Sequence, residues 1–342
     1  MKGKLIFSLS AFKNFQLWGV STRRKKQILW FFTVAILVFI FFFFSCNEKE
    51  KSSLSYNKSF LFINSHATGP YYLAASALAR LITINADYIG VNSSIPLTDN
   101  EKIEQLINKK IDIAFLKGPE ANLAYHGEPF YWKEEQPIRA MFSLWPAVYN
   151  LITYKDNGIK KIEDIKGKSI AIYSENSVNG DILNYFLELY GITSDNTTIY
   201  RVRDIIGINM FLKKEVDSIW YDIGYGGFNF SSTENFILIG IEENIKTREF
   251  FKTYPFFFLE KFGAEVGLPE KYQLMTACFA ACSEDLSEND AYVFTKLWFE
   301  NPSLVRQYIS DNLDLIDDKI RGVPVPFHKG SLKYLKEAGL AY

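Results

Sequence analysis

Residues 59–84 read SFLFINSHATGPYYLAASALARLITI, and this stretch decides the fold class. The apolar run 59–64 predicts a buried strand, and the Ala- and Leu-rich run 71–84 predicts a helix after a polar loop. A short amphipathic helix at 102–109 and a second apolar strand at 111–116 (IDIAFL) follow. Because strand and helix alternate, the sequence predicts an α/β fold with a parallel sheet.

The same alternation is repeated in the middle of the chain. Apolar runs predict strands at 148–154 and 168–173, and residues 181–190 predict a helix that ends at Gly191. Two successive α/β units predict two lobes, and a chain that builds both must cross between them, which predicts a hinge and a cleft. The predicted crossings lie near 146–151 and 243–255, and the predicted lobes are 59–148 with 250–342 (lobe 1) and 149–249 (lobe 2).

The N-terminal segment has the pattern of a membrane signal. Residues 28–45 read ILWFFTVAILVFIFFFFS without a charge, and 18 residues of helix span roughly 27 Å, close to the thickness of a bilayer core. The basic run 23–26 (RRKK) precedes it, which predicts that the body lies on the far side of the membrane. The predicted segments are a basic region 1–27, a transmembrane or lipoprotein signal segment 28–46, and a polar linker 47–58.

Three interpretations of the apolar segment stay open. An uncleaved anchor fits its length, ordinary signal cleavage is the second, and the third is a lipoprotein signal that ends in Ser45-Cys46 with Cys46 lipidated. All three place residues 47–342 outside the cytoplasm, on the periplasmic side. The first and third tether the body to the membrane through the helix or through lipidated Cys46.

Composition excludes several function classes. The 342 residues carry a net charge of −1, and residues 47–342 alone carry about −8, which excludes a general nucleic-acid binder. Three Cys and three His without paired spacing predict neither a disulfide scaffold nor a metal site. No phosphate-binding loop or nucleophile elbow is present. We therefore predict no enzyme activity, no metal and no cofactor.

Four stretches resemble one known family, the TAXI-type solute receptors of tripartite (TRAP) transporters. They are the loop and helix start 62–72, the run 156–168 (DNGIKKIEDIKGK), the segment 216–224, and the C-terminal VPVPFHKG at 323–330 with the residues after it. The match covers about residues 60–340. The first loop departs from the family pattern, because Asn64 and Ala67 stand where the family has Gly.

The resemblance implies a two-lobed fold like that of type II periplasmic binding proteins, with a hinge. It also implies an extracytoplasmic solute-binding protein that captures a small organic acid or amino acid between its lobes, for delivery to the permease subunits of a TRAP-type transporter. The changed glycines keep a second function open, a membrane-anchored sensor or scaffold with a degenerate cleft and no transport partner.

Two polar loops are the predicted ligand sites. Residues 64–70 and 174–180 each end at a helix N-terminus, where free N–H groups and the helix dipole favour a carboxylate. Aromatic residues near the predicted hinge are candidates for the walls, although most aromatic residues serve the core and Ser, Thr and Asn also cap helices. The candidate ligand-binding residues are Ser65, His66, Thr68, Gly69, Tyr71, Trp145, Tyr149, Ser177, Asn179, Trp220 and Tyr225.

Overall fold

The computed structural model describes residues 58–63, 70–86, 88–93, 98–128, 132–174, 177–222, 235–264, 267–309 and 322–340. These residues belong to one compact unit, Tyr56–Tyr342. The predicted segments 1–27 and 28–46, and the linker up to residue 57, lie outside the described residues. Within the described ranges, no helix is both long and apolar enough to cross a membrane.

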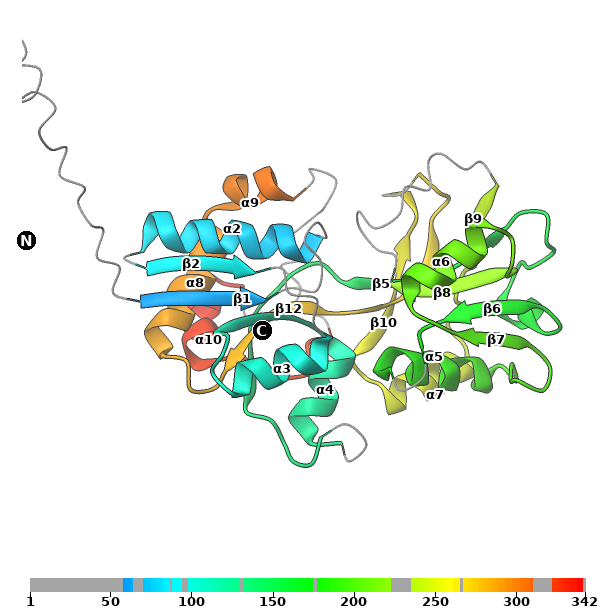
Figure 1. Ribbon diagram of the computed structural model, residues 1–342, viewed down its shortest axis with the longest axis horizontal. Helices are drawn as coiled ribbons and strands as arrows, with labels where there is room; N and C mark the ends of the chain where they lie inside the picture. Colours follow the sequence, from blue (N-terminus) through cyan, green and yellow to red (C-terminus); the bar gives the residue numbers. More distant parts are fainter. Residues whose placement is uncertain are drawn as a thin grey trace, which may run out of the picture. The chain divides into compact units, whose positions relative to one another are not determined.

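The first of the two sheets has five strands in the order β2-β1-β3-β12-β4 (Figure 1). Strand β1 pairs in parallel with β2 and β3, as the sequence predicts. Strand β12 instead runs antiparallel to both β3 and β4, so the sheet is mixed. The strands are β1 (Lys58–Ile63), β2 (Tyr88–Ser93), β3 (Ile113–Lys117), β4 (Ile138–Ser143) and β12 (Cys278–Ser283).

Helices cover both faces of this first sheet. On one face, α2 (Pro70–Asn85) and α8 (Glu288–Glu300) pack with alternate residues of the strands, and α9 (Pro302–Tyr308) packs against α2. On the other face lie α3 (Asp99–Ile107) and α4 (Gly118–His126). The closing helix α10 (Lys329–Glu337) packs on α8. We call the first sheet with these helices lobe 1.

The second sheet has the order β10-β11-β5-β8-β6-β7, with β9 paired to β5. Here β6 is parallel to β7 and β8, whereas β5 is antiparallel to β8 and β11. The strands are β5 (Ala147–Tyr154), β6 (Ser169–Ile172), β7 (Thr198–Arg201), β8 (Ser218–Asp222), β9 (Phe236–Leu238), β10 (Phe257–Phe262) and β11 (Lys271–Thr276). A 3₁₀ helix η2 (Ile162–Ile165) lies before β6.

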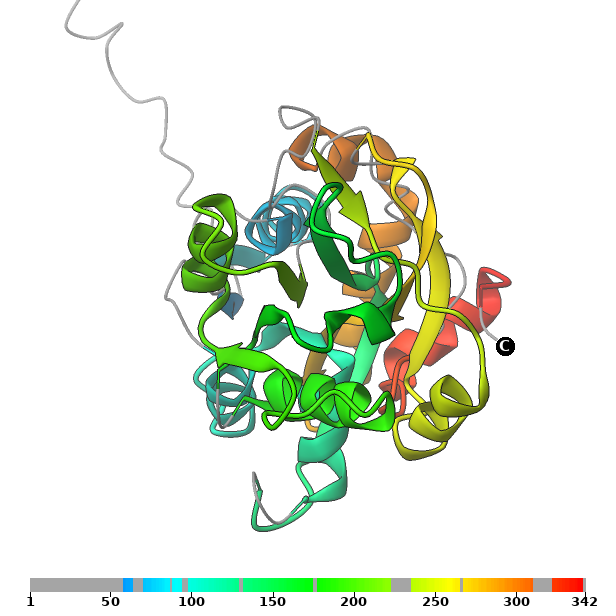
Figure 2. The ribbon, with the colours of Figure 1, turned by 90° about the vertical axis from the view of Figure 1, so that its right-hand side faces the viewer.

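The two faces of the second sheet follow the alternation of side chains along its strands. Leu151 packs with Trp220 and α5 (Val178–Leu189) on one face, together with α7 (Ile245–Thr253). Ile152 and Tyr221 pack with α6 (Asp204–Leu212) on the other face. Figure 2 shows α5 and α7 side by side and α6 apart from them. We call this sheet with its helices lobe 2.

Two antiparallel strands connect the lobes. The first crossing runs from β4 to β5 through residues 144–146, and the second runs from β11 to β12 through Ala277 (Figure 1). The sequence predicted that lobe 2 ends at 249 and that the chain returns near 243–255. That boundary is wrong, because β10 and β11 are paired into the second sheet through β5. The largely apolar run 273–282 (QLMTACFAAC) contributes to both sheets, through β11 and β12.

Candidate functional site

The N-terminus of α4 brings two charged side chains of lobe 1 to the contact between the lobes. Lys117 ends β3, and Gly118-Pro119 begin the helix, with Pro in the first turn. A Cβ at position 118 would clash with the Oγ1 atom of Thr276, so only glycine fits where β11 passes α4. This close approach aims Lys117 and Glu120 at lobe 2.

An ion pair joins the two lobes. The Nζ atom of Lys117 lies 2.8 Å from Oδ2 of Asp222, which ends β8 of lobe 2. The side chains are 20% and 10% exposed. Burial lowers the pKa of Lys117, but Asp222 and the three tyrosines Tyr173, Tyr71 and Tyr149 together raise it more, so the net pKa lies well above the usual value. Lys117 is therefore a permanent cation whose charge is matched across the lobe boundary.

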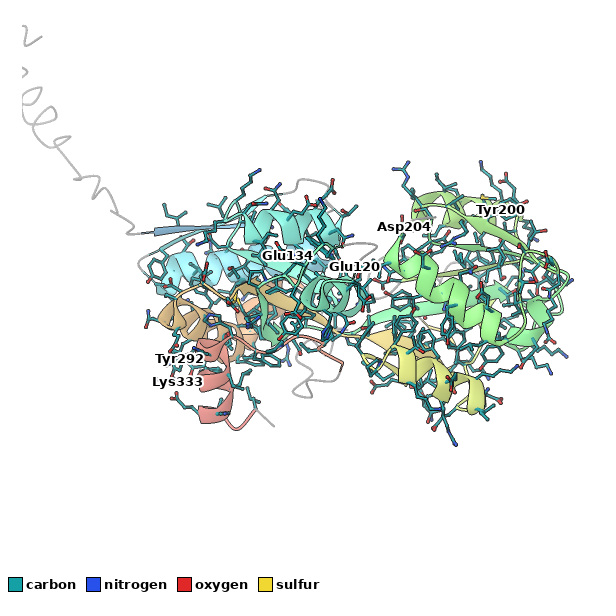
Figure 3. All side chains as sticks on the ribbon, turned by 90° about the horizontal axis from the view of Figure 1, so that it is seen from below. Glu120, Glu134, Tyr200, Asp204, Tyr292 and Lys333 are labelled. Carbon is teal, nitrogen blue, oxygen red and sulfur yellow. The ribbon has the colours of Figure 1, made fainter. Side chains whose placement is uncertain are left out.

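A second interlobe contact is a chain of hydrogen bonds. The Tyr149 hydroxyl donates to Oδ1 of Asn179 at 2.5 Å, and Nδ2 of Asn179 donates to Oε1 of Glu120 at 2.5 Å. All three residues are buried. Asn179 lies in the first turn of α5, so a polar side chain of lobe 2 holds the carboxyl group of lobe 1. Figure 3 shows Glu120 on the part of α4 nearest to lobe 2.

Glu120 is an incompletely satisfied carboxyl group. Its Oε2 atom is buried and has no hydrogen-bond partner within the part of the chain that the structure describes. Burial and the negative charge of Asp99 raise the pKa of Glu120 to about 7. Buried polar atoms without a partner are rare in folded proteins, and each calls for an explanation.

Asp99 is the third carboxyl group of the cluster. It follows the N-cap Thr98 at the start of α3 and lies 2.7 Å from Nζ of Lys102. Although burial opposes ionisation, Lys102 and Lys117 lower the pKa of Asp99 below its usual value. Among the residues that the structure describes, the site therefore holds three carboxyl groups and two ammonium groups: Asp99, Glu120 and Asp222, with Lys102 and Lys117.

Tyrosine hydroxyl groups complete the polar site. Tyr173 accepts a hydrogen bond from the backbone N–H of Asp222 at 3.0 Å. Burial is the main reason why the pKa values of Tyr71, Tyr149 and Tyr173 lie above the usual value. These phenols are neutral at physiological pH, so they act as hydrogen-bond partners and not as charges.

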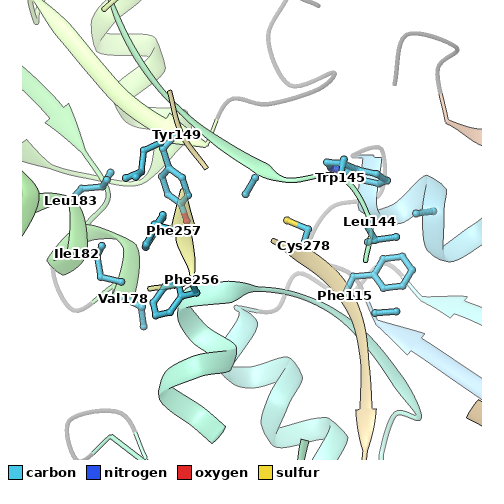
Figure 4. Close-up of a cluster of buried hydrophobic side chains, with 14 of the residues drawn as sticks. Phe115, Leu144, Trp145, Tyr149, Val178, Ile182, Leu183, Phe256, Phe257 and Cys278 are labelled. Atoms are coloured by element: carbon cyan, nitrogen blue, oxygen red, sulfur yellow. The ribbon is translucent and has the colours of Figure 1, made fainter. Parts of the chain in front are cut away.

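The first crossing is lined by stacked aromatic rings. Tyr71 stacks on Trp145 with ring centroids 5.4 Å apart, and its hydroxyl lies 2.7 Å from Sγ of Cys278 at the start of β12. Figure 4 shows Trp145 and Cys278 on one side of this buried region, with Tyr149 and Phe257 on the other. Tyr71 thereby touches both strands that connect the lobes.

The structure places the predicted ligand-binding residues unequally. Tyr149 and Asn179 meet in the interlobe site, and Tyr71 and Trp145 lie at the crossing. Ser177 is the N-cap of α5, and its hydroxyl accepts the N–H of Gly180 at 3.4 Å. Outside the described residues lie Ser65, His66, Thr68, Gly69, Tyr225 and the lipidation candidate Cys46.

Trp220 differs from its predicted role. Its side chain is fully buried in the core of lobe 2, packs edge-on against Phe186 with ring centroids 5.1 Å apart, and donates its indole N–H to the carbonyl oxygen of Tyr149. The position of Trp220 on the α5 face of β8 explains this placement. The indole supports Tyr149 and is not a cleft wall.

Sequence reasoning missed the charged members of the site, which are Asp99, Lys102, Lys117, Glu120 and Asp222. A signal for Lys117 was present, because this residue directly follows the apolar strand predicted at 111–116. Ligands in α/β folds bind at the carboxyl ends of strands. The turn at residues 117–120 (KGPE) is a third junction between a strand and a helix. It is of the same kind as the loops 64–70 and 174–180, which were predicted as ligand sites.

A separate cavity of about 490 Å³ lies in lobe 2 and is lined by polar residues, among them Lys161, Tyr190, Asn244 and Lys271. None of the predicted ligand-binding residues lines it. Within the described ranges, no group of three His, Cys, Asp or Glu side chains is placed to hold a metal ion.

Comparison with known proteins gives a family match and distant structural likenesses. The model of the NMT1-like family matches residues 64–339. Solved structures that resemble the chain include the periplasmic aliphatic sulphonate binding protein SsuA from Escherichia coli (11% identity, TM-score 0.46, 73% of this chain and 78% of that one). A TctC solute binding protein from Polaromonas has 11% identity and a TM-score of 0.48 over 76% and 90% of the two chains.

The amino acid transporter substrate-binding protein AbpA from Streptococcus pneumoniae, solved with L-arginine, has 11% identity and a TM-score of 0.44 over 75% and 94%. Likenesses of this strength do not identify what the chain binds.

Proposed function

The chain belongs to the NMT1-like family, and on this basis we propose that it is an extracytoplasmic solute-binding protein. In this proposal, a small organic acid or amino acid is captured between the two lobes and delivered to the permease subunits of a TRAP-type transporter. The TAXI-like stretches, above all VPVPFHKG at 323–330, support the choice of transporter class. The type II binding-protein arrangement of the lobes is part of the same proposal.

One observation carries the proposal. Polar and charged side chains meet where the lobes touch, beside the two crossings. They come from the junctions between β3 and α4 and between β6 and α5, and from the end of β8. Lys117 and Glu120 come from lobe 1, and Asn179 and Asp222 come from lobe 2. A folded core does not need such a cluster, because burying charges costs free energy that apolar packing avoids. Binding of a polar solute gives these side chains a use.

The geometry also suggests how capture works. Each lobe contributes one partner to each interlobe contact, so a rotation about residues 144–146 and 277 separates Lys117 from Asp222 and Glu120 from Asn179. A ligand that bonds to both walls stabilises the closed arrangement over the open one. The free energy of closure then comes from the difference in ligand affinity between the two arrangements.

The N-terminal residues fit the proposed location. In this proposal, residues 28–46 or a lipid on Cys46 hold the body at the outer face of the membrane, near its permease. Both forms of tether keep the receptor at high local concentration beside its partner, which raises the probability of rebinding.

A second candidate function is a membrane-anchored sensor or scaffold. The observation that favours it is that side chains of the chain itself join the two walls, through the Lys117–Asp222 ion pair and the Asn179–Glu120 hydrogen bond. A scaffold of this kind holds its lobes together without a solute.

A thermal-unfolding screen separates the two functions. The full chain is purified in detergent, because residues 28–45 are apolar, and is heated with each member of a panel of amino acids, keto acids and dicarboxylates. A ligand at 100 times its dissociation constant adds about 2.7 kcal/mol, or roughly 5 °C at this size. A selective shift supports the receptor. A folded protein that no compound shifts supports the scaffold.

A further inference from the structure

Only one of the two oxygen atoms of the Glu120 carboxyl group has a hydrogen-bond partner among the described residues. Oε1 accepts the amide of Asn179, whereas Oε2 is buried and unpartnered among the described residues. The side chain is only 8% exposed, so bulk water reaches little of it. A carboxylate oxygen accepts hydrogen bonds only, and the group that satisfies Oε2 must therefore be a donor.

The cations of the site are already engaged. Lys117 pairs with Asp222, and Lys102 pairs with Asp99 and donates to the carbonyl oxygen of Phe115. Among the described residues, two ammonium groups therefore face three carboxyl groups, and Glu120 is the carboxyl group without a cation of its own. An additional anion beside it would be repelled, whereas an additional cation would complete the charge balance.

We propose that Glu120 is the residue that determines ligand specificity, and that its free Oε2 atom binds the protonated amine of the ligand. This inference rests on the proposed function and narrows it: the solute carries a primary ammonium group, as an amino acid does, and a simple organic acid without an amine is disfavoured. The recognition step is a charge-assisted N–H···O hydrogen bond, in which no covalent bond forms or breaks.

Asn179 positions the carboxyl group for this contact. Its amide oxygen accepts the Tyr149 hydroxyl, which orients the Nδ2 group toward Glu120. With Oε1 held in this way, Oε2 has a fixed direction. Because Asn179 belongs to lobe 2 and Glu120 to lobe 1, the subsite is assembled only when the lobes are closed, and amine recognition is coupled to closure.

Matched ligand pairs test the inference directly. We would titrate the full chain in detergent by calorimetry with L-alanine and pyruvate, L-leucine and 4-methyl-2-oxopentanoate, and L-glutamate and 2-oxoglutarate. The members of each pair differ at the amine. We expect the amine-bearing member of the binding pair to bind roughly ten- to a hundredfold more tightly, which is the usual effect of a hydrogen bond to a charged group.

The variant Glu120→Gln keeps the size of the side chain and an acceptor for Asn179, but removes the negative charge. We expect it to lose most of the preference for the amine, because the amino acid binds more weakly while the keto acid, no longer repelled by the charge, binds at least as tightly as before. The matched control is Glu188→Gln on α5, whose Oε1 atom also accepts an asparagine amide, that of Asn184, at 2.6 Å on the surface. The control should keep the preference.

The outcomes separate the inference from the proposed function. If no compound of either series binds to the folded protein, the proposed function itself fails. If compounds bind but keto acids bind as tightly as amino acids, or if Glu120→Gln keeps the full preference, the receptor stands and the ammonium subsite is refuted.

Discussion

Loss of the Lys117 ammonium group should destabilise the chain strongly, because it leaves Asp222 as a buried and unpaired anion. In Lys117→Met, the carboxylate of Asp222 stays in a site where its side chain is 10% exposed. Removing one partner of a buried ion pair typically costs 3–5 kcal/mol. Since this pair is not fully buried, we expect the lower end, about 3 kcal/mol, and a fall in Tm of roughly 5–6 °C.

A surface ion pair supplies the matched control. Nζ of Lys109 lies 3.0 Å from Oδ2 of Asp285, at nearly the same distance as in the Lys117–Asp222 pair, but the two side chains are 70% and 64% exposed. Exposed pairs contribute less than about 1 kcal/mol. Lys109→Met should therefore lower Tm by no more than about 2 °C. Both variants are measured by thermal and urea unfolding of the full chain in the same detergent.

A double variant separates the ion pair from other roles of Lys117. In Lys117→Met with Asp222→Leu, both charges are gone, and apolar groups of similar size fill the interface. The double variant should be more stable than Lys117→Met alone, because no buried charge is left unpaired. The reasoning is refuted if Lys117→Met loses no more stability than Lys109→Met, or if the costs of the two substitutions simply add.

Three further outcomes test the site and the C-terminal motif. The pKa of Glu120 is raised to about 7 from an ordinary 4.5, so the folded state binds this proton more tightly than the unfolded state does. Between pH 4.5 and 7 the free energy of unfolding should therefore fall as the pH rises, by about 3 kcal/mol in total. The dependence of Tm on pH should be flatter in Glu120→Gln, and identical profiles of the two proteins would contradict the assignment. Asn179→Ala removes the group that holds both a tyrosine hydroxyl and a carboxyl group, and should cost about 2 kcal/mol in urea unfolding, against little for the exposed Asn184→Ala. Gly330→Ala would drive a Cβ into the carbonyl oxygen of Glu288, so the variant should unfold several degrees lower, and an unchanged Tm would show that the helices separate easily.

The pH dependence of binding follows from the same carboxyl group. The amine needs Glu120 ionised, so below pH 7 binding must release its proton, and affinity for an amine should fall up to tenfold per pH unit. The charged groups facing Glu120 are Asp99 and Lys117, and their pKa values are shifted downward and upward, away from this range. Calorimetry in buffers of different ionisation enthalpy measures the proton release directly. Glu120→Gln should show none.

The sequence predicted the α/β class and most of the elements, because period and turn residues are local signals. The helix predicted at 181–190 overlaps α5, which ends one residue earlier at Leu189, and the strand predicted at 148–154 lies within β5. The helix predicted at residues 71–84 lies inside α2. The pattern of residues along the chain did not predict which strands pair with one another, or in which direction. The parallel arrangement holds for β1, β2 and β3, but the two crossing strands run antiparallel to their neighbours.

The second crossing shows why the lobe boundary was misplaced. Residues 273–282 form one buried and largely apolar run without Gly or Pro, although its two halves belong to different sheets. The change of sheet occurs at Ala277, whose carbonyl oxygen accepts the N–H of Gly118. No residue type in the run marks that position, because the crossing is fixed by strand pairing far away in sequence.

The C-terminal motif is accounted for by structure alone. The Nδ1 atom of His328 accepts the N–H of Gly330 at 3.2 Å and thereby caps α10, and its backbone N–H donates to the carbonyl oxygen of Ala140 at 2.7 Å. Gly330 is needed because α10 passes close to the backbone of Glu288. The motif that carries the family resemblance therefore attaches the C-terminal helix to lobe 1 and contributes nothing to the interlobe site.

The two interlobe contacts have opposite effects on closure, and their balance determines what a ligand must supply. The Lys117–Asp222 pair is matched in charge and favours the closed arrangement without help. Asn179 binds one oxygen of the Glu120 carboxyl group, but the other oxygen has no hydrogen-bond partner among the described residues and the negative charge has no cation of its own. Closure of the lobes therefore costs free energy, because it either buries an unpaired carboxylate or requires that Glu120 takes up a proton. A ligand amine removes that cost only in the closed arrangement. Differential affinity of this kind is what allows a solute to drive closure, and a ligand that lacked it would bind without shifting the lobes.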